Sequence, residues 1–376
     1  MMQRILDCTI SRSPHIVETL RQLVEIESPS TEPAAVNRLN DFLAEEFARL
    51  DIQVERIPVP NGGDVLCARY GLGNRPIMIL GHLDTVWPLG TLSQRPVRVE
   101  NGRLFGPGSF DMKGGLGVAL HAMQALRELN VSPRRPLTFF FTPLEEVGGK
   151  AYRDRLETEA QRSQCVLVLE PPMPGGAVKT ARKGAGKMTL RVRGRAAHPG
   201  LAPEQGISAI TELAHQILRL AGLNDPARGV TVNVGVIRGG LRSNVVAAQA
   251  EAEIDIRFPT LQDGQQIVAA IHQLTPVLEG ASLEVSGDIS APPLERTDSV
   301  VALYQQAKRV AAELGFDLPE ASTGGASEGC YTAAVGTPTL DGLGPDGDGA
   351  HAINEHVLIA SLPQRTALLA GLMLTL

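Results

Sequence analysis

Residues 76–86 read PIMILGHLDTV, an apolar run of the length of a short buried strand, followed at once by His82 and Asp84. Open α/β sheets are built from such strands, and they bind their ligands beyond the carboxyl ends of the strands. In extended backbone, side chains two residues apart face the same side. His82 and Asp84 therefore mark a candidate site at the end of a predicted strand.

Acidic residues and a further histidine stand beside other apolar runs or helix starts along the chain. They are Asp111 in GSFDMKGG, Glu145 and Glu146 in TPLEEVGG, Glu170 in VLVLEPP and His351 in GAHAINEH. Each of them alone would more often be a solvated strand end than a ligand. Together, imidazole and carboxylate groups without a thiolate suit two divalent ions, and zinc fits this ligand set best.

Length and charge restrict the class of protein. A chain of 376 residues exceeds what one hydrophobic core usually supports, so we expect two domains. The formal charge of −6 and the dispersed basic residues argue against nucleic acid or an anionic membrane as a partner. We find no apolar segment of signal-peptide or membrane-spanning length, and the four cysteines are far apart. These features favour a cytoplasmic protein with reduced thiols.

The order of the predicted elements divides the chain. Residues 1–182 and 291–376 alternate helices with strands, including two helices between about residues 12 and 57. This alternation predicts a three-layer α/β domain with a mostly parallel sheet. Residues 183–290 follow the order strand-helix-strand-strand-helix-strand, which is typical of a ferredoxin-like α+β domain. We therefore expect a larger domain in two parts, with the smaller domain inserted between them.

Seven segments, in order along the chain, carry a resemblance to a known family. They are GHLDTV, GPGSFDMKGG, LEEVGG, VLEP, RGRAAHPG, TGGASEGCYTAA and GAHAINEHV. The chain resembles the dinuclear zinc exopeptidases, a family that includes glutamate carboxypeptidase, succinyl-diaminopimelate desuccinylase, acetylornithine deacetylase and the aminoacylases. VWPLG (86–90) is more similar to the glutamate carboxypeptidase branch than to the desuccinylase branch. The resemblance implies that residues 1–182 and 291–376 form the catalytic domain and that 183–290 serve as a lid and homodimerisation domain.

The resemblance also implies a set of metal ligands. Asp111 is expected to bridge two zinc ions, for which cobalt or manganese could substitute because all ligands are nitrogen or oxygen. One ion would be held by His82 and Glu170, and the other by Glu146 and His351. A bridging carboxylate allows two ions roughly 3.5–4 Å apart to act on one water and one carbonyl. A helix N-cap is the other plausible role of Asp111, and the two roles are compatible.

Proton transfer and transition-state stabilisation are the next roles that the resemblance implies. Glu145 and Glu146 are adjacent, so in extended backbone they point in opposite directions and cannot both bind one ion. The family pattern makes Glu146 the ligand and Glu145 the general base. We expect the Asp84 carboxylate to accept the other ring hydrogen of His82 and fix its tautomer. His198 in RGRAAHPG is expected to reach the partner subunit's active site and stabilise the developing oxyanion.

Substrate recognition is less well defined by the sequence. An exopeptidase binds a free carboxylate, for which arginine is well suited, but Ala291 stands where several family members have arginine before a proline pair. Arg296 is displaced by several residues. The candidates that remain are Asn233, Arg257, Gly325 and Ser327, the last two in the loop 324–327 whose amides could hold an anion. Arg257 has an equally plausible structural role at a strand end, and Glu328 replaces the aspartate more usual in this loop.

Three functions fit these residues. The first is a carboxypeptidase or dipeptidase that releases a C-terminal amino acid, glutamate-like or small, from a small peptide or acyl group. The second is an N-acyl-amino-acid deacylase or aminoacylase, which uses the same water attack but recognises the other side of the amide. The third is a non-catalytic binding protein with a retained metal site. The presence of Glu145 beside all five expected ligands favours an enzyme with two zinc ions per chain.

Overall fold

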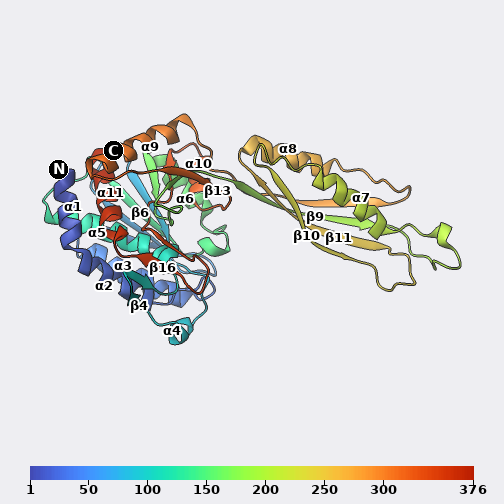
Figure 1. The fold of residues 1–376 in the computed structure, drawn as a ribbon, viewed down its shortest axis with the longest axis horizontal. Helices are drawn as coiled ribbons and strands as arrows, with labels where there is room; N and C mark the ends of the chain where they lie inside the picture. Colours follow the sequence, from blue (N-terminus) through green and yellow to red (C-terminus); the bar gives the residue numbers. More distant parts are fainter. The chain divides into compact units, whose positions relative to one another are not determined.

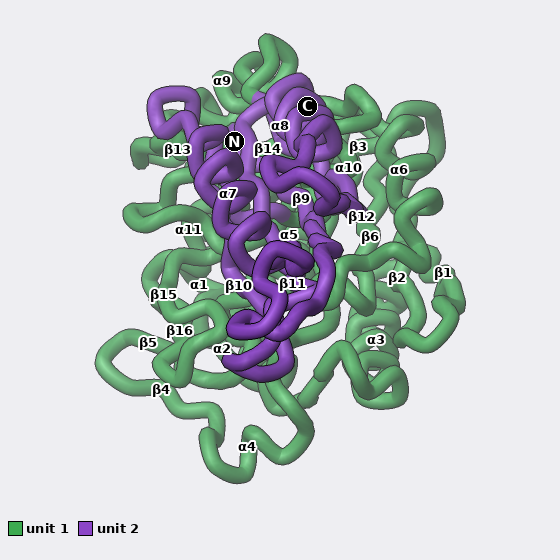
Figure 2. The backbone as a smooth tube through the Cα atoms, turned by 90° about the vertical axis from the view of Figure 1, so that its right-hand side faces the viewer, with its two compact units in different colours: residues 1–180, 296–323, 327–376 green, residues 181–295, 324–326 purple.

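The computed structural model describes residues 1–376, which form two compact units (Figure 2). Unit 1 comprises Met1–Thr180, Arg296–Thr323 and Ser327–Leu376. Unit 2 comprises Ala181–Glu295 and Gly324–Ala326, and the insertion expected at 183–290 lies within it. None of the helices combines the length and hydrophobicity needed to cross a bilayer.

Unit 1 is built on a six-stranded sheet of order β1-β2-β6-β3-β7-β14. The strands are β1 (Gln53–Ile57), β2 (Val65–Tyr70), β3 (Ile77–His82), β6 (Leu137–Thr142), β7 (Cys165–Val168) and β14 (Thr339–Leu340). The four strands from β6 to β14 are parallel, and β2 and β1 continue the sheet antiparallel. This is the mixed α/β fold with a mostly parallel sheet that the alternation of elements predicts.

Helices cover both faces of this sheet. They are α1 (Met2–Ser11), α2 (Ser13–Glu25), α3 (Pro33–Ala48), α5 (Gly114–Glu128), α6 (Arg153–Arg162), α9 (Asp298–Glu313), α10 (Gly329–Ala334) and α11 (Ser361–Thr375). Ile77 and Ile79 of β3 belong to one buried cluster with α1, α2, α3, α5, α9 and α11, whereas Met78 and Leu80 belong to another with α6. Figure 1 shows α5 and α11 on one side of β6 and α6 on the other. Because both faces are covered, every residue of β3, β6 and β7 is buried, which explains why these strands are largely apolar.

Two features of unit 1 were not expected from the sequence. The first is α1, which precedes the two expected helices, α2 and α3, and buries Met2 and Ile5 in the core. The second is a small antiparallel sheet of order β15-β16-β5-β4. Its strands are β15 (Gly347–Asp348), β16 (His356–Leu358), β5 (Arg103–Phe105) and β4 (Arg98–Glu100). The β15–β16 connection contains His351, and β5 leads into the segment that contains Asp111, so this sheet supports two candidate ligands.

Unit 2 contains one four-stranded antiparallel sheet of order β10-β11-β9-β12. Along the chain its elements are β9 (Gly184–Arg193), α7 (Ala209–Ala221), β10 (Thr231–Gly239), β11 (Gln249–Phe258), α8 (Leu261–His272) and β12 (Ser282–Ala291). Met188, Leu190 and Val192 of β9 alternate with exposed or half-buried residues and pack in a core with residues of α7 and α8. Unit 2 therefore has its own hydrophobic core, with polar side chains on the opposite face of its sheet.

Candidate metal centre

Three neighbouring parallel strands of unit 1 carry acidic and imidazole groups at their carboxyl ends. His82 is the last residue of β3, Glu145 and Glu146 follow β6, and Glu170 follows β7. The strands lie side by side in the order β6-β3-β7, so their ends bring these side chains to one edge of the sheet. Asp111 joins them from the turn Ser109–Lys113 that precedes α5. The peptide bond between Asp111 and Met112 is cis.

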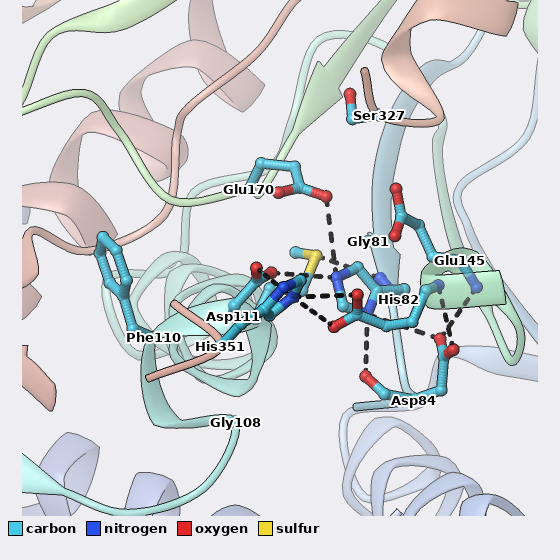
Figure 3. Close-up of polar contacts among 12 residues, drawn as sticks. Gly81, His82, Asp84, Gly108, Phe110, Asp111, Glu145, Glu170, Ser327 and His351 are labelled. Carbon is cyan, nitrogen blue, oxygen red and sulfur yellow. Dashed lines mark hydrogen bonds and ion pairs between the residues drawn. The ribbon is translucent and has the colours of Figure 1, made fainter. Parts of the chain in front are cut away.

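The five expected ligands form two groups that share Asp111 (Figure 3). In one group, His82 Nε2 lies 3.2 Å from Asp111 Oδ1 and 3.7 Å from Glu170 Oε1. In the other, His351 Nε2 lies 3.0 Å from Glu146 Oε2 and 3.5 Å from Asp111 Oδ2. Each oxygen of Asp111 therefore faces a different histidine. This is the arrangement that a carboxylate bridging two cations requires.

The charges of this cluster fit a site for cations. Burial raises the pKa of Glu146 to about 7 and that of Glu145 well above its usual value. Burial alone would lower the pKa of His82, but hydrogen bonds to Asp111 and Asp84 raise it well above its usual value. Several buried carboxylates close together are costly unless positive charge compensates them. Divalent ions would supply that charge, and the nitrogen and oxygen donors are ones that zinc accepts.

The profile of Peptidase family M20/M25/M40 matches residues 78–375. The chain belongs to this family. Carboxypeptidase G2 from Pseudomonas sp. (strain RS-16) is 29% identical over 371 residues, covering 96% of this chain and 89% of the relative. Succinyl-diaminopimelate desuccinylase from Ectopseudomonas mendocina (strain ymp) is 30% identical over 364 residues, covering 90% and 92%. The crystal structure of aminopeptidase PepT from Bacillus cereus ATCC 10987 superimposes with a TM-score of 0.82 at 24% identity, covering 96% of this chain and 98% of the other.

As a member of the M20/M25/M40 family, the chain is a metal-dependent amide hydrolase. Its matched region begins within β3 and ends within α11, so it includes every expected metal ligand and the whole of unit 2. The likeness to the solved aminopeptidase shows the fold.

Asp84 differs from expectation in the atom that contacts His82. The His82 Nδ1–H donates to the main-chain carbonyl of Asp84 at 2.9 Å, whereas the nearer carboxylate oxygen is 3.5 Å away. The carboxylate instead accepts hydrogen bonds from Ser30 Oγ at 2.6 Å and from the main-chain N–H groups of Glu145 and Glu146 at 3.0 and 3.2 Å. These amides open a helical turn and have no partner within it, so they attract an anion. Asp84 thus fixes both the His82 ring and the turn that follows β6.

His198 lies in an exposed loop of unit 2, between β9 and α7. Its Nδ1 accepts a hydrogen bond from the main-chain N–H of Gly200 at 3.2 Å. This contact places the ring proton of a neutral imidazole on Nε2. The exposed side chain can therefore donate a hydrogen bond to an anionic group through Nε2.

Two substrate-binding candidates lie on neighbouring strands of unit 2. Asn233 of β10 pairs with Asp255 of β11, two residues before Arg257. The Arg257 guanidinium binds the Asp255 carboxylate through two hydrogen bonds of 2.8 and 3.0 Å. A substrate carboxylate would have to compete with this bidentate pair. The geometry favours the structural role of Arg257.

The other two candidates are largely used by contacts within the protein. The carbonyl oxygens of Gly325 and Ala326 accept hydrogen bonds from the Arg182 guanidinium at 3.2 and 3.3 Å. The Ser327 side chain is buried, and its hydroxyl donates to the Asp341 carboxylate at 2.7 Å. These contacts hold the loop in place.

Glu328, which replaces the aspartate more usual in its loop, is buried. Its carboxylate accepts hydrogen bonds from Tyr152 Oη at 2.6 Å and Thr142 Oγ1 at 2.7 Å. Burial raises its pKa to about 7. Thr142 ends β6, so Glu328 supports the strand that leads to Glu145. The role of Tyr152 could not be predicted from the sequence. The residue follows a pair of glycines, and nothing in the surrounding sequence connects it to Glu328.

Proposed function

We propose that this chain is a zinc-dependent exopeptidase that releases a C-terminal amino acid, glutamate-like or small, from a small peptide or an acyl group. The observation that carries the proposal is the position of Asp111, whose Oδ1 lies 3.2 Å from His82 Nε2 and whose Oδ2 lies 3.5 Å from His351 Nε2. Glu170 completes the first group and Glu146 the second. Each group supplies one imidazole and a carboxylate of its own, which suits one zinc ion per group.

The residues around this centre suit hydrolysis by an activated water. When bound, a pair of zinc ions polarises the scissile carbonyl and makes the attacking water more acidic. A carboxylate oxygen of Glu145 lies within 4.8 Å of ligand atoms of His82 and Glu170, so it can reach a water held there. Glu145 takes the water's proton and then delivers it to the leaving amine. Asp84 holds the turn that presents Glu145, through the main-chain amides of that turn.

Two relatives bear on the substrate class, and each supports a different reaction. The relative named carboxypeptidase G2 and the segment VWPLG (86–90) support release of a C-terminal amino acid. The relative named succinyl-diaminopimelate desuccinylase supports the alternative, an N-acyl-amino-acid deacylase. Both reactions break an amide beside a free carboxylate by the same attack of water.

A substrate panel separates these functions. We expect zinc-loaded protein to release glutamate from folyl-glutamate, or a small C-terminal residue from dipeptides, faster than it cleaves N-acetyl or N-succinyl amino acids. Quantifying the released amino acid by chromatography, with metal-free protein as the control, provides the comparison. Faster cleavage of the N-acyl substrates would favour the deacylase. Turnover of none of them by protein with a full metal complement would favour a binding protein.

We further propose that unit 2 mediates homodimerisation. Strand β10 is at the edge of its sheet, so one side of its backbone is unpaired. Apolar side chains are exposed along this edge and on α7, which packs beside it: Ile210, Leu218, Val236 and Ile237. An unpaired strand edge flanked by exposed apolar side chains is suited to pairing with a second copy of itself.

The proposed compartment is the cytoplasm. Cys8, Cys67, Cys165 and Cys330 are all buried, and none of them forms a disulfide. Free thiols of this kind are usual in a reducing compartment.

A subunit-mixing experiment tests the proposed role of His198 across the dimer. We expect His198→Ala to retain its metal and bind substrate but lose about 10²- to 10³-fold in kcat, the usual effect of removing one oxyanion donor. Mixed with a Glu145→Gln variant, it should regain activity because one site of each mixed dimer then has both residues. Random mixing makes half of the dimers mixed, with one working site each, so roughly a quarter of wild-type activity should return.

The matched control for this experiment is His272→Ala, which removes another exposed histidine of unit 2, at the end of α8. This variant should keep wild-type activity. Mixed dimers can be counted by mass spectrometry of differently tagged subunits. If mixed dimers form and no activity returns, His198 does not act on the partner's site.

A further inference from the structure

Glu355 is a buried carboxylate with an unusually complete set of hydrogen-bond donors. Only 1% of its surface is exposed. Its Oε2 accepts hydrogen bonds from the Gly108 N–H and from Trp87 Nε1, both at 2.8 Å. Its Oε1 accepts from the N–H groups of Phe110 at 3.1 Å and Asp111 at 3.0 Å. Two donors per oxygen occupy the four acceptor positions of a carboxylate.

Three of these donors belong to the turn that presents Asp111. Gly108 begins the turn with φ of 73°, and a Cβ there would lie 2.5 Å from the Thr85 side chain, so the turn requires glycine. Hydrogen bonds from these three amides to one charged acceptor are stronger than bonds between neutral groups. Glu355 therefore fixes the main chain of Asp111 itself, without contacting its carboxylate.

The same carboxylate connects the two segments that contain histidine ligands. Trp87 lies in the loop after β3, and its indole reaches Glu355. Glu355 lies in the β15–β16 connection, shortly after His351. The Arg95 guanidinium stacks 4.2 Å from the centre of the Trp87 ring and donates to the Ala352 carbonyl at 3.4 Å. The loop after β3, the Asp111 turn and the His351 segment are thus joined at one point.

We propose that Glu355 is a positioning residue that sets the separation of the two ligand groups through the main chain of Asp111. This inference rests on the metal ligands of the proposed function. All four donors to Glu355 are main-chain amides or an indole, so it holds the protein around the ions without binding an ion or the substrate. Sequence reasoning considered His351 in GAHAINEHV but gave no role to Glu355, because the donors it binds come from residues 87–111.

The isosteric variant Glu355→Gln tests this inference. Glutamine keeps the shape but replaces one acceptor oxygen by an NH₂ group, which in either orientation would face two N–H donors. We expect affinity for zinc, measured by competition with a chromophoric chelator, to fall about 10- to 100-fold, the usual effect of disturbing a group that orients ligands. The visible absorption of bound Co²⁺ should also change, because the ligand geometry changes. When the metal is saturating, the kcat of Glu355→Gln should be closer to the wild-type value than its zinc affinity is.

Two further variants grade the effect. Trp87→Phe removes one donor and leaves the three amides, so it should weaken zinc binding less than Glu355→Gln. Glu355→Asp keeps the charge and both acceptor oxygens, and it should recover part of the affinity. Glu100→Gln makes the same chemical change at an exposed position of β4, in the same small sheet, and should have no effect. Thermal unfolding of the metal-free proteins shows which variants are folded.

The outcomes separate this inference from the proposed function. If wild-type protein binds no divalent ions, the proposed function fails. If wild-type protein binds two and folded Glu355→Gln binds them with unchanged affinity and an unchanged Co²⁺ spectrum, the positioning role is wrong. If Glu355→Gln does not fold, Glu355→Asp and Trp87→Phe decide the question. Wild-type zinc affinity in both would overturn the inference.

Discussion

Removing divalent ions with a chelator should abolish hydrolysis, and restoring zinc should return it. The expectation follows from the five proposed ligands, which form two groups around Asp111. Elemental analysis should find close to two ions per chain, the number that a shared carboxylate can hold. Cobalt and manganese should also support turnover, because the ligands are nitrogen and oxygen only. Metal-free protein with full activity would contradict the entire proposal.

A pair of aspartate variants sharpens this test. Asp111→Asn removes the charge that both ligand groups share, so it should bind fewer ions and lose turnover. Asp348→Asn is the matched control, since Asp348 is an exposed aspartate of β15 near the same segment. Zinc should raise the unfolding temperature of the wild-type protein and of Asp348→Asn, since ligands that bind only the folded state stabilise it. The same shift in Asp111→Asn would exclude Asp111 as a ligand.

Glu145→Gln should retain both metal ions and lose roughly two or more orders of magnitude in kcat, the usual contribution of a general acid–base. The substitution keeps the size of the side chain and removes its ability to accept a proton. Glu146→Gln should behave differently and bind metal weakly, because Glu146 Oε2 lies 3.0 Å from His351 Nε2 within a ligand group. Metal content and single-turnover kinetics of the two variants form the comparison. If Glu145→Gln loses metal and Glu146→Gln keeps it, the two roles are exchanged.

The parts of the structure that could be predicted are those with a local signal. The runs before His82, Glu145 and Glu170 are largely apolar because helices cover both faces of the sheet. Their ends therefore stand out in the sequence, and parallel pairing brings these ends together. Asp111 and His351 have no comparable strand signal, and the resemblance to a family was needed to include them. The structure brings all five to one place.

Apart from α1, the features that were missed depend on contacts between residues that are distant in the sequence. Strands of two or three residues, such as β15 and β16, are too short to show an alternation of apolar and polar residues. They form only because β5 pairs with β16. The role of Glu355 could not be seen without them. The carboxylate of Asp84 was expected at His82 because side chains alternate along a strand, but the chain turns after β3 and presents the Asp84 carbonyl instead. The Glu328 carboxylate binds Tyr152 and Thr142, which no local pattern connects to it.

The order of the ligands along the chain has a consequence for biosynthesis. Four of them precede unit 2 in the sequence, whereas His351 follows it, as do β14 at the edge of the larger sheet and α11 in its core. A nascent chain that has emerged only as far as unit 2 can form the antiparallel sheet of that unit, whose residues are almost all contiguous. It cannot yet complete the larger sheet or the second ligand group. With the proposed ligands, stable binding of both ions would therefore wait until the segment after unit 2 has been made, so metal binding would be a late step that reports on completed folding.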